Sequence, residues 1–313
     1  MRIVSLLPSA TEIVCALGLE EKLVAVTHEC DYPLVVRSKP VITSSALDHA
    51  QSSSRHIHEG IAGLLHAGKS IYHLHERLLV ELQPDLILTQ ELCEVCAVSY
   101  RIVRDAARIL EGETEIISLE PNSVGDILAN IRLVGEKTGS QKSASELIES
   151  LQRRIDHVTC RTSAITNSPR VYCMEWLDPP FAAGHWIPEM VSMAGGIEGL
   201  GQAGQPSKQI AWQEVVDFAP EVIVLMPCGF DLNRTVEEGR RVTTYPQWDS
   251  LPAVRNGRVF AVDGSSYFNR PGPRIIDGLE VLAQIIHPQL LQFSFAGGTI
   301  QRMNDVPDFE SRV

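Results

Sequence analysis

Thiol and imidazole side chains gather in loops that are expected to follow buried strands. Two cysteines three apart stand in the segment QELCEVCAVSY, and further candidates stand in HECDYP and PCGFD. Zinc prefers thiolate and imidazole ligands in tetrahedral sites, and iron–sulfur clusters are held by thiolates. Because separate loops can supply one site, the sequence allows a zinc or iron–sulfur centre. Its candidate ligands are His28, Cys30, Cys93, Cys96 and Cys228.

The same residues leave other interpretations open. A single CxxC is weak evidence for zinc, since structural zinc sites usually combine two ligand pairs. A redox pair is less favoured, because Glu91 and Glu94 would raise the pKa of the neighbouring thiols. The cysteines can also be plain packing residues. Cys, His and Asp are the parts of a thiol acyl-transfer site, but no GxSxG, P-loop, GxGxxG or HExxH motif is present, so binding is favoured over catalysis.

Aromatic side chains stand in the same kind of loop. Trp176 and Trp186 both fall in EWLDPPFAAGHWIP, and further aromatic and polar residues fall in PCGFD and GSSYFNRPGP. Aromatic faces dominate pockets that bury sizeable, partly flat ligands, although such side chains also pack plain cores. The candidate ligand-binding residues are Trp176, Phe181, His185, Trp186, Phe230, Asp231, Tyr267, Phe268 and Arg270.

Arg270 stands in NRPGPR, where proline and glycine stiffen the loop. A preorganised guanidinium can pair with a carboxylate, a phosphate or an amide oxygen of a ligand. An equally good interpretation is an ion pair with Asp263 or Asp277 that fixes the loop itself.

Alternating strand and helix patterns position these loops. The expected strands lie at residues 2–7, 22–27, 85–90, 170–175, 221–226 and 258–263, and the expected helices at 11–18, 54–67 and 75–83. Ser9 and Gly18 are expected to cap the first helix. A weak repeat relates 78–93 to 214–228, which favours two similar halves. Strands that alternate with helices indicate a mainly parallel sheet, and ligands bind beyond the carboxyl ends of such strands.

A long helical region separates the two halves. Residues 124–160 are interrupted only by Gly135 and Gly139, and their second part carries an amphipathic apolar stripe. We therefore expect an α/β protein with two Rossmann-like lobes of mainly parallel sheet, joined by one long rigid helix. The expected divisions are 1–122 for the N-terminal lobe, 123–160 for the connecting helix, 161–290 for the C-terminal lobe and 291–313 for a tail.

Composition excludes several classes of partner. With a formal net charge of −12 the chain shows no basic stripe for nucleic acid. No run of about 18 apolar residues is present, so no membrane insertion is expected. The first strand begins almost at Met1 without a basic or apolar leader, and the cysteines number seven, with irregular spacing. Both features predict a reduced, cytoplasmic location.

Several stretches resemble a known family. RIVSLLPSATEIVCALGL, VAVTHECDYP, LQPDLILTQ, EWLDPPFAAGHW and VFAVDGSSYFNRPGPRIIDGLEVLAQIIHP are similar to the cobalamin-binding branch of the class III substrate-binding proteins of ABC importers. The similar region runs over residues 2–288, nearly the whole chain. The resemblance implies two α/β lobes joined by one long helix, with a ligand between them.

For this chain the resemblance implies a corrinoid, such as cobalamin, or a similar macrocycle in the inter-lobe cleft, and an ABC importer permease as a candidate partner. The aromatic residues that would flank the corrin ring are Tyr32, Trp176, Phe181, Trp186, Phe230 and Phe268. His28 or His185 can supply an axial ligand to its cobalt. The alternative is a cytoplasmic metalloprotein or thiol enzyme that uses the cysteines of the same cleft.

Overall fold

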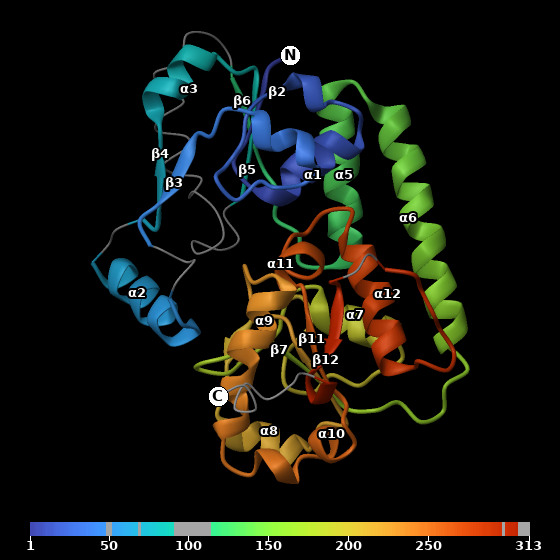
Figure 1. The fold of residues 1–313 in the computed structure, drawn as a ribbon. Helices are drawn as coiled ribbons and strands as arrows, with labels where there is room; N and C mark the ends of the chain where they lie inside the picture. Colours follow the sequence, from blue (N-terminus) through green and yellow to red (C-terminus); the bar gives the residue numbers. More distant parts are fainter. Residues whose placement is uncertain (48–51, 68–69, 91–113, 296–297, 306–313) are drawn as a thin grey trace. The chain divides into compact units, whose positions relative to one another are not determined.

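The computed structural model describes residues 1–47, 52–67, 70–90, 114–295 and 298–305. Its contacts divide the chain into two compact units (Figure 1). Unit 1 consists of Met1–Ser52, His56–Pro121 and Gly125–Ser150, and unit 2 of Ser53–Arg55, Asn122–Val124 and Leu151–Val313. Each unit has its own sheet and its own apolar core.

Unit 1 is built on a parallel sheet in the order β2-β1-β5-β6. Its strands are β1 (Ile3–Ser5), β2 (Leu23–Ala25), β5 (Leu86–Thr89) and β6 (Glu115–Ser118). A separate antiparallel pair joins β3 (Thr43–Ser45) to β4 (Tyr72–Leu74). Every residue of β5 is buried, because a central parallel strand is covered on both faces.

The first half of the chain carries helices α1 (Pro8–Ala16), α2 (Ser54–His66) and α3 (Glu76–Leu82), with the 3-10 turns η1 (Glu20–Lys22) and η2 (Leu34–Ser38). α1 begins at Pro8 because proline suits the first helical position, and Leu7 precedes it in extended conformation. The predicted cap at Ser9 is therefore wrong, since Ser9 lies inside the first turn. Gly18 follows α1 with a φ of +73°, as expected of a glycine beyond a helix C-terminus.

The predicted long helical region contains two helices, α5 (Val124–Thr138) and α6 (Gln141–Thr162). They are separated at Gly139, whose φ of +72° is a conformation that glycine adopts without strain. α6 belongs to unit 1 up to Ser150 and to unit 2 from Leu151, so it is the helix that continues from one unit into the other (drawn in green in Figure 1). Its predicted apolar stripe includes three buried residues: Leu151, Ile155 and Val158.

Unit 2 is built on a mixed sheet in the order β12-β11-β10-β7-β8-β9. Its strands are β7 (Val171–Trp176), β8 (Phe181–Ala182), β9 (Lys208–Gln209), β10 (Val222–Leu225), β11 (Val259–Val262) and β12 (Ile300–Arg302). β10 pairs in parallel with β7 and with β11, whereas β12, β8 and β9 are antiparallel to their neighbours. The predicted α/β class with mainly parallel sheets is confirmed.

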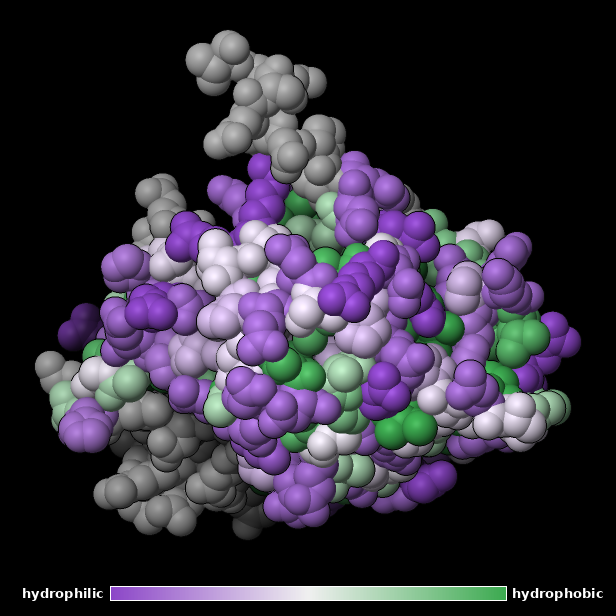
Figure 2. All heavy atoms as spheres, turned by 90° about the horizontal axis from the view of Figure 1, so that it is seen from below, coloured by the Kyte–Doolittle hydropathy of each residue, from purple (hydrophilic) through white to green (hydrophobic). Residues whose placement is uncertain are grey.

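The helices of unit 2 are α7 (Ile187–Met193), α8 (Trp212–Phe218), α9 (Leu232–Gly239), α10 (Pro252–Arg255), α11 (Gly264–Tyr267) and α12 (Ile275–Ile286), and its 3-10 turns are η3 (Arg240–Thr244), η4 (Trp248–Ser250) and η5 (Met303–Asp305). α12 is apolar along most of its length and packs against α7. The face drawn in Figure 2 is largely polar, with apolar residues scattered among the polar ones. Over the described ranges, none of the helices combines the length and the apolar character needed to cross a bilayer.

Candidate functional site

The segments that follow β7, β10 and β11 begin at the same edge of the sheet of unit 2, because these three strands are parallel and adjacent. Counted from the last two residues of β7, these segments comprise residues 175–188, 226–231 and 263–274, and they include the short elements β8 and α11. We call them the carboxyl edge of unit 2. All the candidate ligand-binding residues of the C-terminal half lie in this region.

Trp176 and Phe230 form one part of this edge. Trp176 is half-buried at the end of β7, and its ring meets that of Phe230 edge-on with 5.5 Å between centroids. Phe230 is only 1% exposed, and the Arg234 guanidinium lies 3.7 Å from its ring centroid. Asp231 caps α9, since its carboxylate accepts a 2.9 Å hydrogen bond from the Arg234 amide. Phe230 and Asp231 thus hold the loop, and Trp176 keeps an accessible part.

Trp186, Phe268 and His185 form a second part. Trp186 is 6% exposed, and its Nε1 donates a 2.9 Å hydrogen bond to the Phe268 carbonyl, which joins two loops of the edge. The Phe268 side chain is completely buried. His185 stacks on Trp186 with 5.5 Å between centroids. The backbone of His185 has a φ of +50°, which is uncommon for a residue other than glycine.

Three buried polar atoms at this edge have no hydrogen-bond partner within the described part of the chain. They are Trp176 Nε1, His185 Nδ1 and Asn269 Oδ1, and a fourth such atom, Asn130 Nδ2, lies on α5. A buried polar atom without a partner costs about 1–3 kcal/mol relative to a satisfied one. Such atoms are rare in folded proteins, and several in one place indicate a missing ligand or ordered water.

Close backbone packing keeps the loops together. A side chain at Gly264 would place its Cβ 2.6 Å from the Pro227 carbonyl oxygen, so only glycine fits this approach. Ser265 N donates a hydrogen bond to the Phe230 carbonyl, and Asn269 N donates one to the Gly264 carbonyl. The donor–acceptor distance is 3.0 Å in both. The loops after β10 and β11 are therefore one rigid piece, and this piece fixes the position of Asn269.

Burial shifts the ionisable groups of the edge toward their neutral forms. It raises the pKa of Glu175, although the Ser207 hydroxyl donates a 2.7 Å hydrogen bond to that carboxylate. It likewise raises the pKa of Asp263, against the opposing effect of Ser266 and of two arginines. Burial lowers the pKa of His185.

Asp263 and Asp277 are the two carboxylates predicted to form an ion pair with Arg270. Asp263 lies in the electrostatic field of Arg270 and Arg274. Asp277 pairs with Arg154 of α6, whose Nη2 also lies 2.7 Å from a Glu280 carboxylate oxygen. The loop carries the Tyr267 ring as well, with the Arg274 guanidinium 5.7 Å from its centroid.

The other predicted site residues lie in unit 1. Tyr32 is 46% exposed in the loop after β2. Cys30 is 8% exposed, with its Sγ 3.1 Å from Thr11 Oγ1 and 3.2 Å from Thr27 Oγ1. His28 is exposed, and its Nδ1 lies 2.8 Å from Thr43 Oγ1. Cys30 is thus embedded among hydroxyl groups.

The five predicted metal ligands are not brought together by the described structure. Cys93 and Cys96 lie outside the described residues, Cys30 and His28 belong to unit 1, and Cys228 belongs to unit 2. Within the described ranges, no group of three or more His, Cys, Asp or Glu side chains is arranged to hold a metal ion. A zinc or iron–sulfur site stays a prediction.

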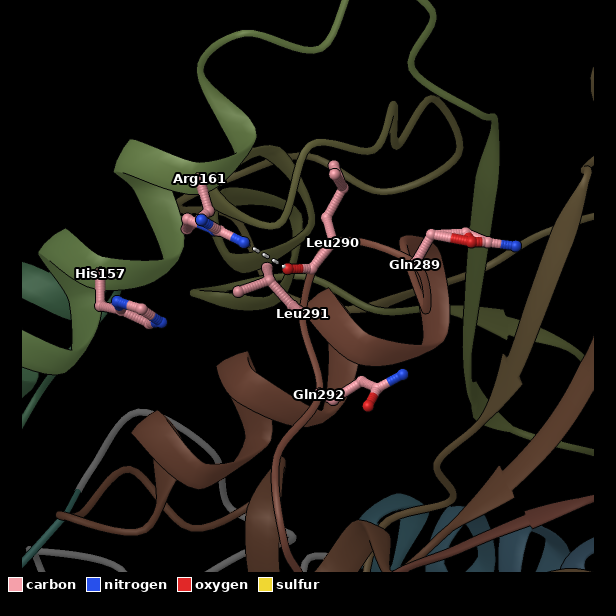
Figure 3. A pocket seen from close by; sticks show the side chains of 6 residues that line it. All are labelled: His157, Arg161, Gln289, Leu290, Leu291 and Gln292. Atoms are coloured by element: carbon pink, nitrogen blue, oxygen red, sulfur yellow. Dashed lines mark hydrogen bonds between the residues drawn. The ribbon is translucent and has the colours of Figure 1, made fainter.

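A groove in unit 2 has no counterpart in the sequence predictions (Figure 3). It has a volume of about 510 Å³ and lies between the end of α6 and the segment after α12. Arg161 donates a 3.1 Å hydrogen bond from Nη2 to the Leu290 carbonyl across it. Its lining residues are His157, Arg161, Gln289, Leu290, Leu291 and Gln292. None of them belongs to the carboxyl edge of unit 2.

Sequence reasoning also missed Asn269 and Glu175. Both stand beside residues that were named, Arg270 and Trp176, but nothing in the local pattern shows whether a polar side chain has a partner. That property depends on neighbours supplied by other loops.

Comparisons with known proteins agree on one family. A family model described as periplasmic binding protein matches residues 3–265. A substrate-binding lipoprotein of an ABC transporter from Bacillus subtilis, YvrC, is 26% identical over 290 residues, which cover 92% of this chain and 80% of that protein. A vitamin B12-binding protein of Vibrio cholerae is 25% identical over 283 residues, covering 89% of this chain and 86% of that protein.

Solved structures show the same fold. The periplasmic vitamin B12-binding protein BtuF of Vibrio cholerae superimposes with a TM-score of 0.66 at 22% identity, covering 92% of this chain and 96% of that one. The periplasmic heme-binding protein RhuT of Roseiflexus gives a TM-score of 0.67 at 23% identity, covering 92% of this chain and 98% of that one. The comparisons lend no support to a thiol enzyme or to a zinc or iron–sulfur protein.

These relatives contradict the predicted cytoplasmic location. The family is described as periplasmic, and one relative is a lipoprotein of an ABC transporter. Both descriptions indicate a place of action outside the cytoplasm. The prediction was wrong because it was drawn from the first residues and from the number and spacing of the cysteines, and neither feature determines where a protein of this family acts.

Proposed function

Because the chain belongs to the periplasmic binding protein family and is thus a solute-binding protein, we propose that its solute is a corrinoid or a similar macrocycle. One observation carries this proposal. Aromatic side chains from separate loops gather at the carboxyl edge of unit 2, where ligands of parallel α/β sheets bind.

The half-buried aromatic residues of the edge are the proposed contacts. Trp176, Phe181 and Tyr267 each keep part of their surface accessible. A flat macrocycle gains from lying against such faces, since aromatic contacts add to the burial of apolar area. Asp231 and Arg270 are proposed as polar contacts at the rim.

The fully buried aromatic residues have a supporting part in this proposal. Trp186, Phe230 and Phe268 hold the loops through internal contacts. Rigid loops favour binding, because less conformational freedom is lost when the ligand docks.

The relatives support the class of ligand. A sequence relative and a solved structure, both from Vibrio cholerae, are named for vitamin B12, and a further solved structure is named for heme; both ligands are tetrapyrrole-type macrocycles. The substrate-binding lipoprotein among the relatives belongs to an ABC transporter. We therefore propose that an ABC importer permease receives the ligand from this protein.

A visible-absorption titration of purified, metal-analysed protein with aquocobalamin tests the proposal. We expect a saturable spectral change that ends at one equivalent. A shift of the visible band would in addition identify axial coordination, for which His28 and His185 are the predicted donors. The absence of binding to aquocobalamin, with hemin giving the same negative result, would overturn the proposal.

A further inference from the structure

We infer that the carboxyl edge of unit 2 recognises carboxamide groups on its ligand, with Trp176 Nε1 as the donor and Asn269 Oδ1 as the acceptor. The inference rests on the proposed function and adds to it the chemical character of the ligand's periphery. It distinguishes a ligand edged by amides from one edged by carboxylates.

The two atoms are the reason for this inference. Trp176 Nε1 and Asn269 Oδ1 are buried, and neither has a hydrogen-bond partner in the part of the chain that the structure describes. Buried polar groups are almost always satisfied in folded proteins. Their partners therefore lie outside the described residues, and a ligand is the partner that we propose.

A continuous series of contacts links the two residues. The Trp176 ring contacts the Phe230 ring, and the Phe230 carbonyl accepts a hydrogen bond from Ser265 N. Ser265 follows Gly264, whose carbonyl accepts from Asn269 N. Both unpartnered atoms therefore belong to one packed cluster at the ends of three adjacent strands.

Their chemistry is complementary. An indole N–H can only donate, and an amide oxygen can only accept. A carboxylate on the ligand would satisfy the indole but has no hydrogen to offer Asn269. A carboxamide has both a carbonyl oxygen and N–H groups, so carboxamides on the ligand supply the kind of partner that each atom needs. His185 Nδ1 is the third atom without a partner in the described chain, and it can donate or accept a hydrogen bond according to the tautomer of the ring.

The charges of the edge favour the same ligand. Four acidic and three arginine side chains stand in residues 175–188, 226–234 and 263–274. They are Glu175, Asp178, Asp231, Asp263, Arg234, Arg270 and Arg274. Asp178 is paired with Arg55 through two hydrogen bonds of 2.9 and 3.0 Å. A polycarboxylate ligand would need a surplus of positive charge, which these loops do not offer, whereas neutral amides need none.

A pair of matched corrinoids tests the inference. Dicyanocobinamide carries carboxamides around the corrin ring, and dicyanocobyrinic acid carries carboxylates at the same positions; cyanide occupies both axial positions in each. Affinities are measured by quenching of tryptophan fluorescence. We expect the wild-type protein to bind the amide compound at least tenfold more tightly.

Two substitutions separate the atoms. Asn269→Leu should weaken binding of the amide compound about tenfold and leave the carboxylate compound unchanged, because only the amide donates to Asn269. Trp176→Phe should weaken both compounds to a similar extent, since both offer an acceptor to the indole. Trp212→Phe is the matched control, because the Trp212 Nε1 already donates a 2.7 Å hydrogen bond to the Pro246 carbonyl. It should leave both affinities unchanged.

The outcomes distinguish the two levels of the proposal. Equal affinity of wild-type protein for both compounds, or an unaltered preference in Asn269→Leu, would overturn the inference and leave corrinoid binding intact. This is the result expected if ordered water satisfies the two atoms. Failure of wild-type protein to bind either compound would overturn the inference, and failure to bind aquocobalamin and hemin as well would overturn the proposed function. Thermal melts of each variant establish that it is folded.

Discussion

The carboxyl edges of the two sheets differ in how their side chains are satisfied. In unit 1 the described part of the edge is a network of short polar groups: Ser5 Oγ lies 2.8 Å from Thr11 Oγ1, which lies 3.1 Å from Cys30 Sγ. In unit 2 the edge is aromatic and holds three of the four buried polar atoms that have no partner among the described residues. Both sheets have parallel central strands, so the backbone does not cause this difference.

The difference shows that one architecture can serve two purposes. Short hydroxyl and thiol groups satisfy one another, which stabilises the loops of unit 1 without exposing binding groups. Large rings offer few hydrogen-bonding groups to the polar atoms between them, and three buried polar atoms of the unit 2 edge have no partner among the described residues. We expect substitutions at the two edges to act on different properties, as follows.

The largest effect is expected from Phe268→Ala in unit 2. Removing this fully buried ring should lower the free energy of unfolding by about 3–5 kcal/mol. A smaller deletion in the core of unit 1, Ile13→Val, should cost only about 1 kcal/mol, because it removes one buried methylene group. Urea denaturation followed by circular dichroism measures both. A loss below about 1 kcal/mol for Phe268→Ala would show that the aromatic edge is not part of the core.

Ligand affinity should respond to the two edges unequally. Trp176→Ala should weaken binding of aquocobalamin by about 1–3 kcal/mol, since the half-buried indole is a proposed contact. Tyr32→Ala, at the exposed loop of unit 1, should weaken it by less than about 1 kcal/mol. Isothermal titration calorimetry gives both values. A larger effect at Tyr32 would reverse the comparison and make unit 1 the main source of affinity.

Replacing a polar side chain by an apolar one of similar shape should separate the edges further. Thr11 is fully buried and contacts both Ser5 and Cys30, so Thr11→Val should reduce the free energy of unfolding by about 1–2 kcal/mol. Asn269→Leu removes an unpartnered oxygen and should not reduce stability in the absence of ligand. Thermal unfolding of the two variants beside the wild type checks this. Equal losses would mean that Asn269 has an undetected partner.

The smallest expected effect is a dependence of stability on pH. Partial desolvation lowers the pKa of both His28, whose side chain is exposed by surface area, and His185 from 6.5, so the unfolded chain binds protons more readily at these two residues than the folded one. The contribution of each histidine is complete above pH 6.5 and is lost as the pH falls through that value toward the lower folded pKa. The contribution of the two histidines should therefore lower the urea midpoint as the pH is lowered from 7.5 to 5.5, whereas the raised pKa values of Glu175, Asp263 and Glu198 act in the opposite direction.

Substituting glutamine for each histidine assigns the pH dependence to an edge. His28→Gln and His185→Gln should each flatten the pH profile of the urea midpoint, because each removes a group that titrates differently in the two states. If both variants kept the wild-type profile, other groups would be responsible for it.

Much of the fold was predictable because it depends on local patterns. The strands β5 and β10 stand in continuous apolar runs after a proline and an acidic residue, and both are buried as expected of parallel strands. Gly139 marked the interruption between α5 and α6, because glycine alone adopts its positive φ without strain. Ser9 was a misleading cap signal, since the neighbouring Pro8 is the better helix start.

The candidate site was predictable only in its composition. The alternation of strands and loops places Trp176, Phe230 and Phe268 at one edge, but it does not show that Phe230 and Phe268 are buried while Trp176 keeps an accessible part. The same holds for the predicted metal ligands. The sequence places all of them in loops that follow strands, but the structure divides the described ones between two units.

The amino-acid sequence by itself determined the α/β class, the order of strands and helices, and the loops that carry aromatic residues, because periodicity and turn residues act over short distances. Only the tertiary structure decided which polar atoms are satisfied. Trp186 Nε1 finds its acceptor at Phe268, 82 residues away, whereas Trp176 Nε1 finds none in the described chain. Hydrogen bonds form between neighbours in space, and those neighbours are chosen by the packing of the whole unit.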